Sequence, residues 1–243
     1  KEIENKYLFI LSPPYSGSTL LHQIISTSRN VSSNNTIEKT REGQKLKEVR
    51  QIMFDDKLKR WNPDIEMPWR LIKNEWYKYW DTSKTILLEK SPPNLIRAFK
   101  IENEFVPCYF VSLMRNPYAI AEGWHRRHSE TGDRERFISN LINWFKYQEK
   151  NLQGLNNILY VRYEHLVMNP QDVKQELINF LPELEDIDVD KKFTSHNTRN
   201  ISIPITNLNA EKIARLDPLF IKYITSKLKP IESTIKYLGY ELL

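Results

Sequence analysis

Short apolar runs recur along the chain, and polar residues or prolines end each of them. Residues 7–11 are apolar and β-prone, and the run stops at Ser12-Pro13-Pro14, where proline prevents further strand pairing. Three later runs have the same character: residues 85–89, 109–114 and 158–161. Four short buried strands separated by helical segments predict an α/β fold, with a mostly parallel central sheet and helices on both faces.

The segments between these runs carry apolar residues at helical spacing. In residues 18–28, Leu20, Leu21, Ile24 and Ile25 fall on one side of a helix. Helices are expected at residues 18–28, 42–59, 68–80, 95–103 and 134–152, and another begins at Pro117. The tryptophans Trp76, Trp80 and Trp144 are expected in the core. Residues 186–209 are charged and rich in Asn and Thr, and short helices follow them.

The composition fits one domain with a substantial core. With 243 residues and 40% apolar content, the chain is too large and too apolar for a disordered or disulfide-built module. No internal repeat or boundary divides it, so residues 1–243 are expected to form a single domain. Cys108 is the only cysteine, which excludes an internal disulfide, and its apolar neighbours predict a strand core. The five histidines form no pair at a recognised ligand spacing, so no metal site is expected.

Charge and hydropathy say less about function. The balance of 36 basic against 31 acidic residues suits an anionic ligand, but it fits a mixed-sign solvated surface equally well. No run of about eighteen apolar residues predicts a membrane span, and no charged-then-apolar signal segment follows Lys1. We therefore expect no membrane segment and a cytoplasmic location. The oligomeric state is not indicated.

Polar residues cluster where the predicted strands end. These clusters are residues 12–19, 89–91, 115–117 and 162–164. In an open parallel sheet, ligands bind beyond the carboxyl ends of the strands. The functional site is therefore expected at that edge of the sheet.

The first cluster has the chemistry of an anion-binding loop. It joins a strand to a helix, and Gly17 permits a tight turn in which the amides of residues 16–19 point at an anion. The hydroxyl groups of Ser16, Ser18 and Thr19 add further donors. A nucleoside-triphosphate loop needs an earlier glycine and a lysine after the second glycine, and both are absent here. This absence disfavours a kinase or ATPase.

The loop resembles the 5′-phosphosulfate loop of sulfotransferases that use 3′-phosphoadenosine 5′-phosphosulfate (PAPS). The matching residues are Pro14, Ser16, Gly17, Ser18 and Thr19. A second match, Arg115-Asn116-Pro117 after a strand, resembles the 3′-phosphate element of that family. The resemblance implies that Arg115 binds the phosphate that distinguishes PAPS from other adenine nucleotides.

Three later segments agree with this family in order and kind. Residues 88–92 resemble its Glu-Lys-Ser-Pro element, residues 160–166 resemble its Arg-Tyr-Glu element, and residues 199–208 resemble the segment that closes over the nucleotide. The resemblance spans roughly residues 7–225 and implies a P-loop NTPase-like sulfotransferase architecture. The cofactor-binding residues that it implies are Pro14, Tyr15, Ser16, Gly17, Ser18, Thr19, Arg115, Tyr163 and Arg199.

Two positions depart from the family pattern. Tyr15 stands where many members have a Lys or Arg that bridges the leaving phosphate and the sulfuryl group. Gly123 replaces the Ser that commonly follows the 3′-phosphate arginine by eight residues. With Tyr15, the transition state must be stabilised by another cation or by a hydrogen bond from the phenol. With Gly123, either a neighbour such as Arg126 or Arg127 compensates, or the chain binds PAPS less tightly.

Sulfuryl transfer is an in-line displacement that needs a cation at the leaving oxygen and a base for the acceptor proton, but no metal. The resemblance places Lys90 beside the sulfuryl group, so we expect Lys90 to be that cation. Glu42 and Glu89 are the candidate bases. Glu42 also reads as a charge at a helix N-terminus, and Glu89 as a carboxylate in a structural hydrogen bond.

Two other functions stay open. One is a P-loop-type nucleotide kinase or phosphotransferase, and the other is a non-catalytic basic module that binds polyanions. No basic run interleaved with aromatics is present, so we do not expect nucleic acid as a partner. The acceptor hydroxyl of a transferase remains open among sugar, tyrosine, lipid and secondary metabolite. Residues 42–80 are expected to shape its pocket.

Overall fold

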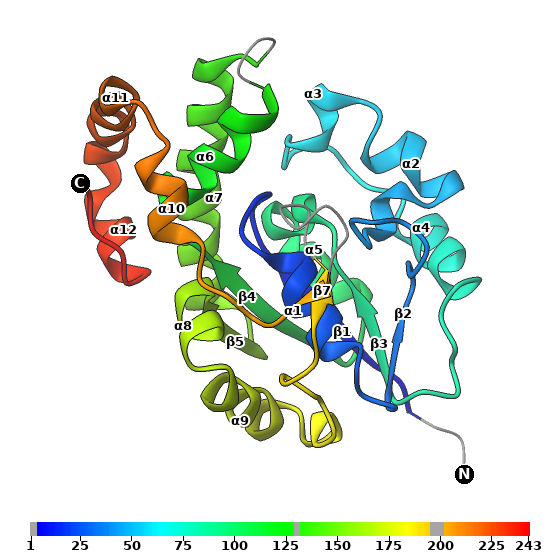
Figure 1. The fold of residues 1–243 in the computed structure, drawn as a ribbon. Helices are drawn as coiled ribbons and strands as arrows, with labels where there is room; N and C mark the ends of the chain where they lie inside the picture. The colour runs from blue at the N-terminus through cyan, green and yellow to red at the C-terminus, as the bar shows by residue number, and fades with distance from the viewer. Residues whose placement is uncertain (1–3, 129–131, 195–201) are drawn as a thin grey trace.

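A parallel sheet of five strands forms the centre of the protein (Figure 1). The computed structural model describes residues 4–128, 132–194 and 202–243. The strands lie in the order β2-β3-β1-β4-β5, and every neighbouring pair is parallel. Their bounds are Lys6–Leu11 (β1), Val31–Ser33 (β2), Ile86–Glu89 (β3), Cys108–Met114 (β4) and Ile158–Arg162 (β5). The predicted mostly parallel sheet is confirmed, and β1 is its central strand.

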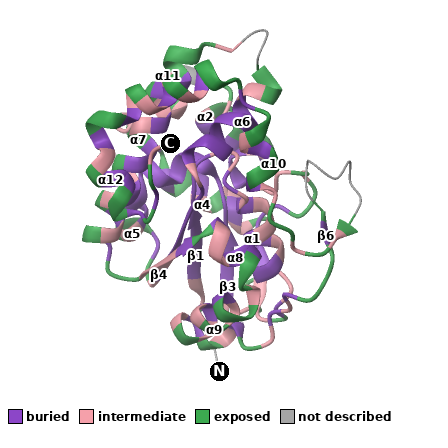
Figure 2. Cartoon of the chain, turned by 60° about the vertical axis from the view of Figure 1, so that its left-hand side comes forward, coloured by how far each residue is buried: buried purple, intermediate pink, exposed green. Residues whose placement is uncertain are grey.

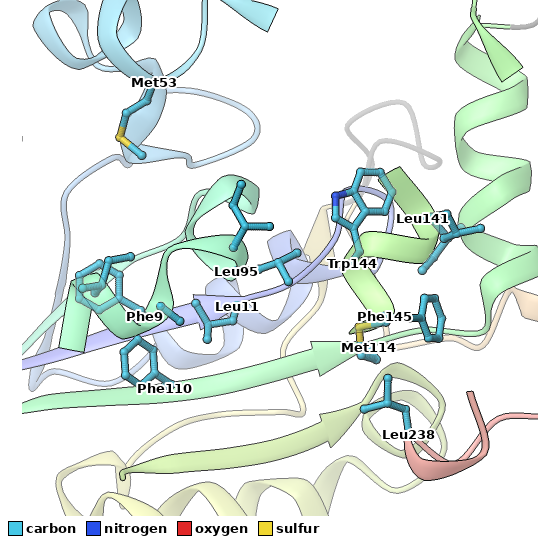
Figure 3. Packing of buried hydrophobic residues seen from close by; sticks show 14 of the residues in the cluster. Phe9, Leu11, Met53, Leu95, Phe110, Met114, Leu141, Trp144, Phe145 and Leu238 are labelled. Carbon is cyan, nitrogen blue, oxygen red and sulfur yellow. The ribbon is translucent and has the colours of Figure 1, made fainter. Parts of the chain in front are cut away.

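Side chains of the central strands alternate between two apolar clusters, because successive residues of a strand point to opposite faces. Phe9 and Leu11 pack in one cluster with Phe110 and Phe145, part of which Figure 3 shows. Leu8 and Ile10 pack in the other cluster with residues of the following helix. Both faces of the sheet are therefore buried, as Figure 2 shows for β1.

Helices cover each face. The cluster that contains Leu8 is covered by α1 (Ser18–Ile25), α8 (Tyr163–Met168) and α9 (Pro170–Phe180). The helices over the opposite cluster include α4 (Trp69–Tyr77), α5 (Ala98–Glu104), α6 (Pro117–His128), α7 (Arg134–Gly154), α11 (Pro218–Leu228) and α12 (Glu232–Tyr237). A short helix, α10 (Asn209–Ala214), packs against α6.

The prediction of one continuous helix at residues 42–59 is wrong. The segment forms a 3-10 turn at Gly43–Lys45, then α2 (Lys47–Met53) and α3 (Lys57–Arg60). Leu46 has extended dihedral angles, which end the turn before α2 begins. The Gly43 amide donates a hydrogen bond to the Glu89 carboxylate, so a contact with the distant end of β3 fixes this turn.

Two strand pairings were not predicted. The edge strand β2 has only three residues, Val-Ser-Ser, and no apolar pattern marks it. A two-stranded antiparallel ribbon joins β6 (Phe193–Thr194) to β7 (Ser202–Ile203).

The core positions of Trp76, Trp80, Trp144 and Cys108 are confirmed, since all four side chains are buried. Within the described ranges, no helix is both long enough and apolar enough to cross a membrane.

Candidate active site

A cavity of about 450 Å³ opens at the carboxyl ends of β1, β3 and β4. On one side, which we call the loop side, it is lined by residues 14–19 except Ser16, together with Arg115, Tyr163 and Lys212. On the other side, the insert side, it is lined by Glu42, Lys45, Phe54 and Arg60. Lys90 and residues 126–128 of α6 also contribute to its wall.

The loop after β1 has the backbone conformation of an anion-binding turn. Tyr15 and Gly17 have positive φ angles of 66° and 88°. Gly17 is the N-cap of α1, and no side chain caps this helix end, so the first-turn amides of Ser18 and Thr19 have no partner within the helix. Tyr163 requires the glycine, because a Cβ at position 17 would lie 2.4 Å from its ring. The loop presents free backbone donors and the positive end of the α1 dipole.

Arg115 lies at the end of β4, where it is nearly fully buried. Its Nε donates to Asn209 Oδ1 at 2.7 Å, and its Nη1 donates to the carbonyl oxygen of Tyr15 at 3.4 Å. The guanidinium stacks 3.8 Å from the centre of the Tyr163 ring. Its Nη2 is buried and has no hydrogen-bond partner among the described residues. A buried, held guanidinium with a donor to spare is suited to a phosphate.

A carboxylate behind Arg115 fixes this arrangement. Glu164 accepts hydrogen bonds from the Asn116 amide at 2.9 Å, from Asn209 Nδ2 at 2.5 Å and from the Tyr240 hydroxyl at 2.9 Å. Asn209 therefore links Glu164 to Arg115. The sequence analysis missed Asn209, because it begins α10 one residue beyond the segment 199–208 that resembles the family.

Lys212, also from α10, is a second cation near Arg115 that the sequence analysis missed. Its side chain is only 4% exposed and its Nζ lies 3.4 Å from Glu122 Oε2. Burial, together with the nearby positive charge of Arg115, lowers the pKa of Lys212 to about 8. The pKa of Lys212 is therefore close to physiological pH.

Lys90 connects the loop to the insert side. Its Nζ donates to Thr19 Oγ1 at 3.4 Å and to the carbonyl oxygen of Thr40, and it lies 3.7 Å from Glu42 Oε1. The side chain is 1% exposed, and burial lowers its pKa, while the charge of Glu42 acts in the opposite direction. The structure thus brings the predicted cation and one of the two predicted bases together beside the anion loop.

Glu89, the other predicted base, lies behind the cavity and does not line it. It is fully buried and accepts hydrogen bonds from the Gly43 amide at 3.0 Å, from Ser91 Oγ at 2.5 Å and from Asn94. Burial raises the pKa of Glu89 to about 7 against the effect of these donors. Through Gly43, this carboxylate fixes the turn that carries Glu42.

Tyr15 and Gly123, the two departures from the family pattern, are in contact. A Cβ on Gly123 would lie 2.9 Å from Tyr15 Cβ, so the glycine makes room for the tyrosine. The Tyr15 hydroxyl is 3.0 Å from His128 Nε2, and the guanidinium of Arg127 lies 5.2 Å from the centre of the Tyr15 ring. Helix α6 therefore brings a cation close to position 15.

On the insert side, two of the cations that line the cavity lie around one aromatic ring. The Arg60 guanidinium lies 4.8 Å, and Lys45 Nζ 5.3 Å, from the centre of the Phe54 ring. Burial lowers the pKa of Arg60, which the charge of Glu42 raises in part. Sequence analysis had no signal for Arg60, because it ends the four-residue helix α3, and Arg97 holds its backbone carbonyl from another part of the chain.

The structure brings most of the predicted site residues to one cavity. Lining it are Pro14, Tyr15, Gly17, Ser18, Thr19, Glu42, Lys90, Arg115 and Tyr163. Ser16 is buried within the loop, and its hydroxyl group has no hydrogen-bond partner among the described residues. Arg199 lies outside the described residues.

Comparisons with known proteins agree with this fold. The chain is similar over its full length to a sulfotransferase domain from the curacin biosynthetic pathway, with 19% identity, a TM-score of 0.53 and all of both chains covered. A Mycobacterium avium sulfotransferase, STF9, has a TM-score of 0.60 at 10% identity, covering 100% of this chain and 79% of that one. Mouse sulfotransferase SULT7A1, solved in complex with PAP, has a TM-score of 0.54 at 11% identity, covering 98% and 90%. At such low identity these likenesses show the fold.

No curated protein matches this chain in sequence. A family model described as "Sulfotransferase family" matches residues 8–188, which include the anion loop, Lys90, Arg115 and Tyr163. This match covers well over half of the sequence. The chain therefore belongs to the sulfotransferase family.

Proposed function

We propose that this chain transfers a sulfuryl group from PAPS to an acceptor hydroxyl by in-line displacement. The observation that carries the proposal is the position of Lys90 Nζ, 3.4 Å from Thr19 of the anion loop and 3.7 Å from Glu42. A cation, a loop for the leaving phosphate and a carboxylate base thus meet at one wall of the cavity. These are the groups that sulfuryl transfer needs.

The loop side fits the two charged ends of PAPS. The amides of residues 16–19 and the uncapped α1 N-terminus suit the 5′-phosphosulfate. The buried Nη2 of Arg115, without a protein partner, and the cation of Lys212 suit the 3′-phosphate. Tyr163 supports both, since it packs on Gly17 and under Arg115. When bound, PAPS supplies the sulfuryl group.

The chain's own residues then have distinct roles. Lys90 neutralises the charge that develops on the oxygen of the leaving 5′-phosphate. Glu42 accepts the proton of the acceptor hydroxyl while the oxygen of that hydroxyl attacks sulfur. Glu89 is a positioning residue, because its bond to the Gly43 amide holds the turn on which Glu42 lies. Lys90 takes the role that a cation at position 15 has in many family members.

The donor assignment is tested by calorimetric titration of adenosine 3′,5′-bisphosphate (PAP), 5′-AMP and ATP. PAP should bind at least tenfold more tightly than 5′-AMP, because charge-assisted hydrogen bonds contribute roughly 1.5–3 kcal/mol each. Arg115→Met should remove most of this preference. Arg29→Met is the control, since Arg29 is an exposed partner of Asp186 outside the cavity.

Equal affinities for PAP and 5′-AMP would overturn the donor assignment. Tighter binding of ATP than of PAP would instead favour the nucleotide phosphotransferase. A preference for PAP that persists in Arg115→Met would show that residues other than Arg115 bind the 3′-phosphate.

A further inference from the structure

The cavity holds more positive charge than the donor needs. Seven Lys or Arg residues line it, and the only carboxylate among its lining residues is that of Glu42. The cations are Lys45, Arg60, Lys90, Arg115, Arg126, Arg127 and Lys212. On the proposed function, Arg115 and Lys212 serve the 3′-phosphate and Lys90 the transferred group. Of the other four, Arg126 pairs with Glu122 and Arg127 lies over the Tyr15 ring. Lys45 and Arg60, on the insert side, are left without a role.

Arg60 is a partly desolvated cation that forms no ion pair with the residues described by the structure. Its Nε is buried and has no hydrogen-bond partner among the described residues, and its guanidinium rests on the rings of Phe54 and Trp61 at 4.8 and 5.4 Å. The charge of Glu42 raises the pKa of Arg60, but Glu42 is itself 3.7 Å from Lys90. Removing a cation from water without a partner costs free energy, which a bound anion offsets.

A second arginine holds Arg60 in place. Arg97 donates hydrogen bonds to the carbonyl oxygens of Lys59, Arg60 and Asn62 at 3.0, 3.0 and 3.2 Å, which fixes the end of α3. This brings two guanidinium groups close together, and the pKa of Arg97 falls to about 10 through burial and through the charge of Arg60. The backbone that carries Arg60 is therefore held in place in spite of the repulsion between the two guanidinium groups.

Lys45 is the second cation on the insert side of the cavity. It lies 5.3 Å from the centre of the Phe54 ring, which places Lys45 and Arg60 around one aromatic surface. Its charge is close enough to Lys90 to lower the pKa of that lysine. The insert side thus combines two cations, an apolar ring and, next to them, the proposed base Glu42.

We propose that the acceptor carries an anionic group, a carboxylate or a phosphate, which Arg60 and Lys45 bind on the insert side. Arg60 forms paired hydrogen bonds with this anion, Phe54 packs against the apolar part of the acceptor, and the hydroxyl lies at Glu42. The proposal rests on the assignment of the loop side to the donor. It narrows the acceptor to small hydroxylated anions.

The test uses the full chain and a matched pair of probes, 4-hydroxyphenylacetate and its neutral amide, 4-hydroxyphenylacetamide. Each is titrated by calorimetry into the PAP-saturated protein and into the protein alone. The acid should bind at least tenfold more tightly than the amide. Arg60→Gln should reduce this ratio to below threefold, and Arg60→Lys should restore part of it. A parallel titration with 4-hydroxyphenyl phosphate tells which of the two anions is preferred.

Arg50→Gln is the matched control, because Arg50 stacks 5.1 Å from the same Phe54 ring but pairs with Asp55 and does not line the cavity. It should leave the ratio unchanged. Equal affinities for acid and amide, absent binding of both included, would overturn the proposal, as would a preference that survives in Arg60→Gln. Failure of PAP to bind is a separate result: it removes the donor assignment, while the acid preference of the protein alone still reports on Arg60.

Discussion

The two sides of the cavity hold their cations in different ways. On the loop side, Arg115 is bonded to Asn209 and to a loop carbonyl, and Lys212 lies beside Glu122. On the insert side, Arg60 and Lys45 rest on an aromatic ring, and neither forms an ion pair with a described residue.

On the proposed function, this difference separates recognition of the donor from recognition of the acceptor. A donor with two fixed anionic ends is best recognised by groups that a rigid network holds in place. Cations on an aromatic surface fix the sign of a partner's charge while they leave its shape open. Each of the following predictions tests whether the two sides act independently.

The largest expected effect belongs to Glu42→Gln. Loss of the proposed base should lower turnover on the order of 10²–10⁴-fold, while PAP affinity stays within about twofold, since the loop side is not altered. Radiolabelled PAPS with a hydroxylated acceptor gives turnover, and calorimetry gives affinity. Glu48→Gln, an exposed carboxylate of α2, is the control. Unchanged turnover would exclude Glu42 as the base.

Lys90→Ala should lower turnover by about 10²-fold with little change in PAP affinity, because its contact strengthens as the phosphate leaves. Lys39→Ala, an exposed lysine of the same segment as Thr40, is the control. Tyr15→Arg should rescue Lys90→Ala in part, since it restores a cation at the position where many family members have one. A large loss of PAP affinity in Lys90→Ala would instead place Lys90 in ground-state binding.

Gly123→Ala should weaken PAP binding by about tenfold, because the added Cβ would lie 2.9 Å from Tyr15 Cβ and overpacking costs roughly 1–3 kcal/mol. The double variant Gly123→Ala/Tyr15→Gly removes the clash and should recover most of the affinity. Calorimetry on the two single variants and the double variant forms a double-mutant cycle. A double variant as weak as Gly123→Ala alone would show that the two positions are not coupled.

The smallest effect is the pH dependence of PAP affinity. Lys212 has a pKa of about 8, so the proportion of its charged form falls as the pH rises through this value. Affinity should therefore decrease about fourfold between pH 7 and 8.5, a range above the second phosphate ionisation near 6. Lys212→Arg should remove this dependence. An equally steep profile in Lys212→Arg would assign it to another group.

The arrangement of the loop side could be predicted from sequence because the geometry of a parallel sheet determines where the residues after each strand lie. Residues 14–19, Lys90, Arg115 and Tyr163 each follow a strand, and parallel strands bring their carboxyl ends to one edge. Sequence order was therefore enough to place them together.

The remaining parts depend on contacts without a local signal. The helix expected at residues 42–59 is interrupted because Gly43 bonds to Glu89, far away along the chain. Arg60 is held by Arg97 through backbone carbonyls. Asn209 and Lys212 lie in the short helix α10, beyond the last segment that resembles the family. Local propensity cannot report such tertiary constraints.

The central place of β1 in the sheet has a consequence for the nascent chain. Its hydrogen-bonding neighbours are residues 86–89 of β3 and 108–112 of β4, so this strand leaves the ribosome long before either partner exists. At 5–20 residues per second, about 100 residues take on the order of 5–20 s to synthesise. During this time the apolar run that precedes the anion loop is exposed. Cellular yield of this protein should therefore respond to chaperones that bind short apolar strands, and chains released before residue 112 should aggregate.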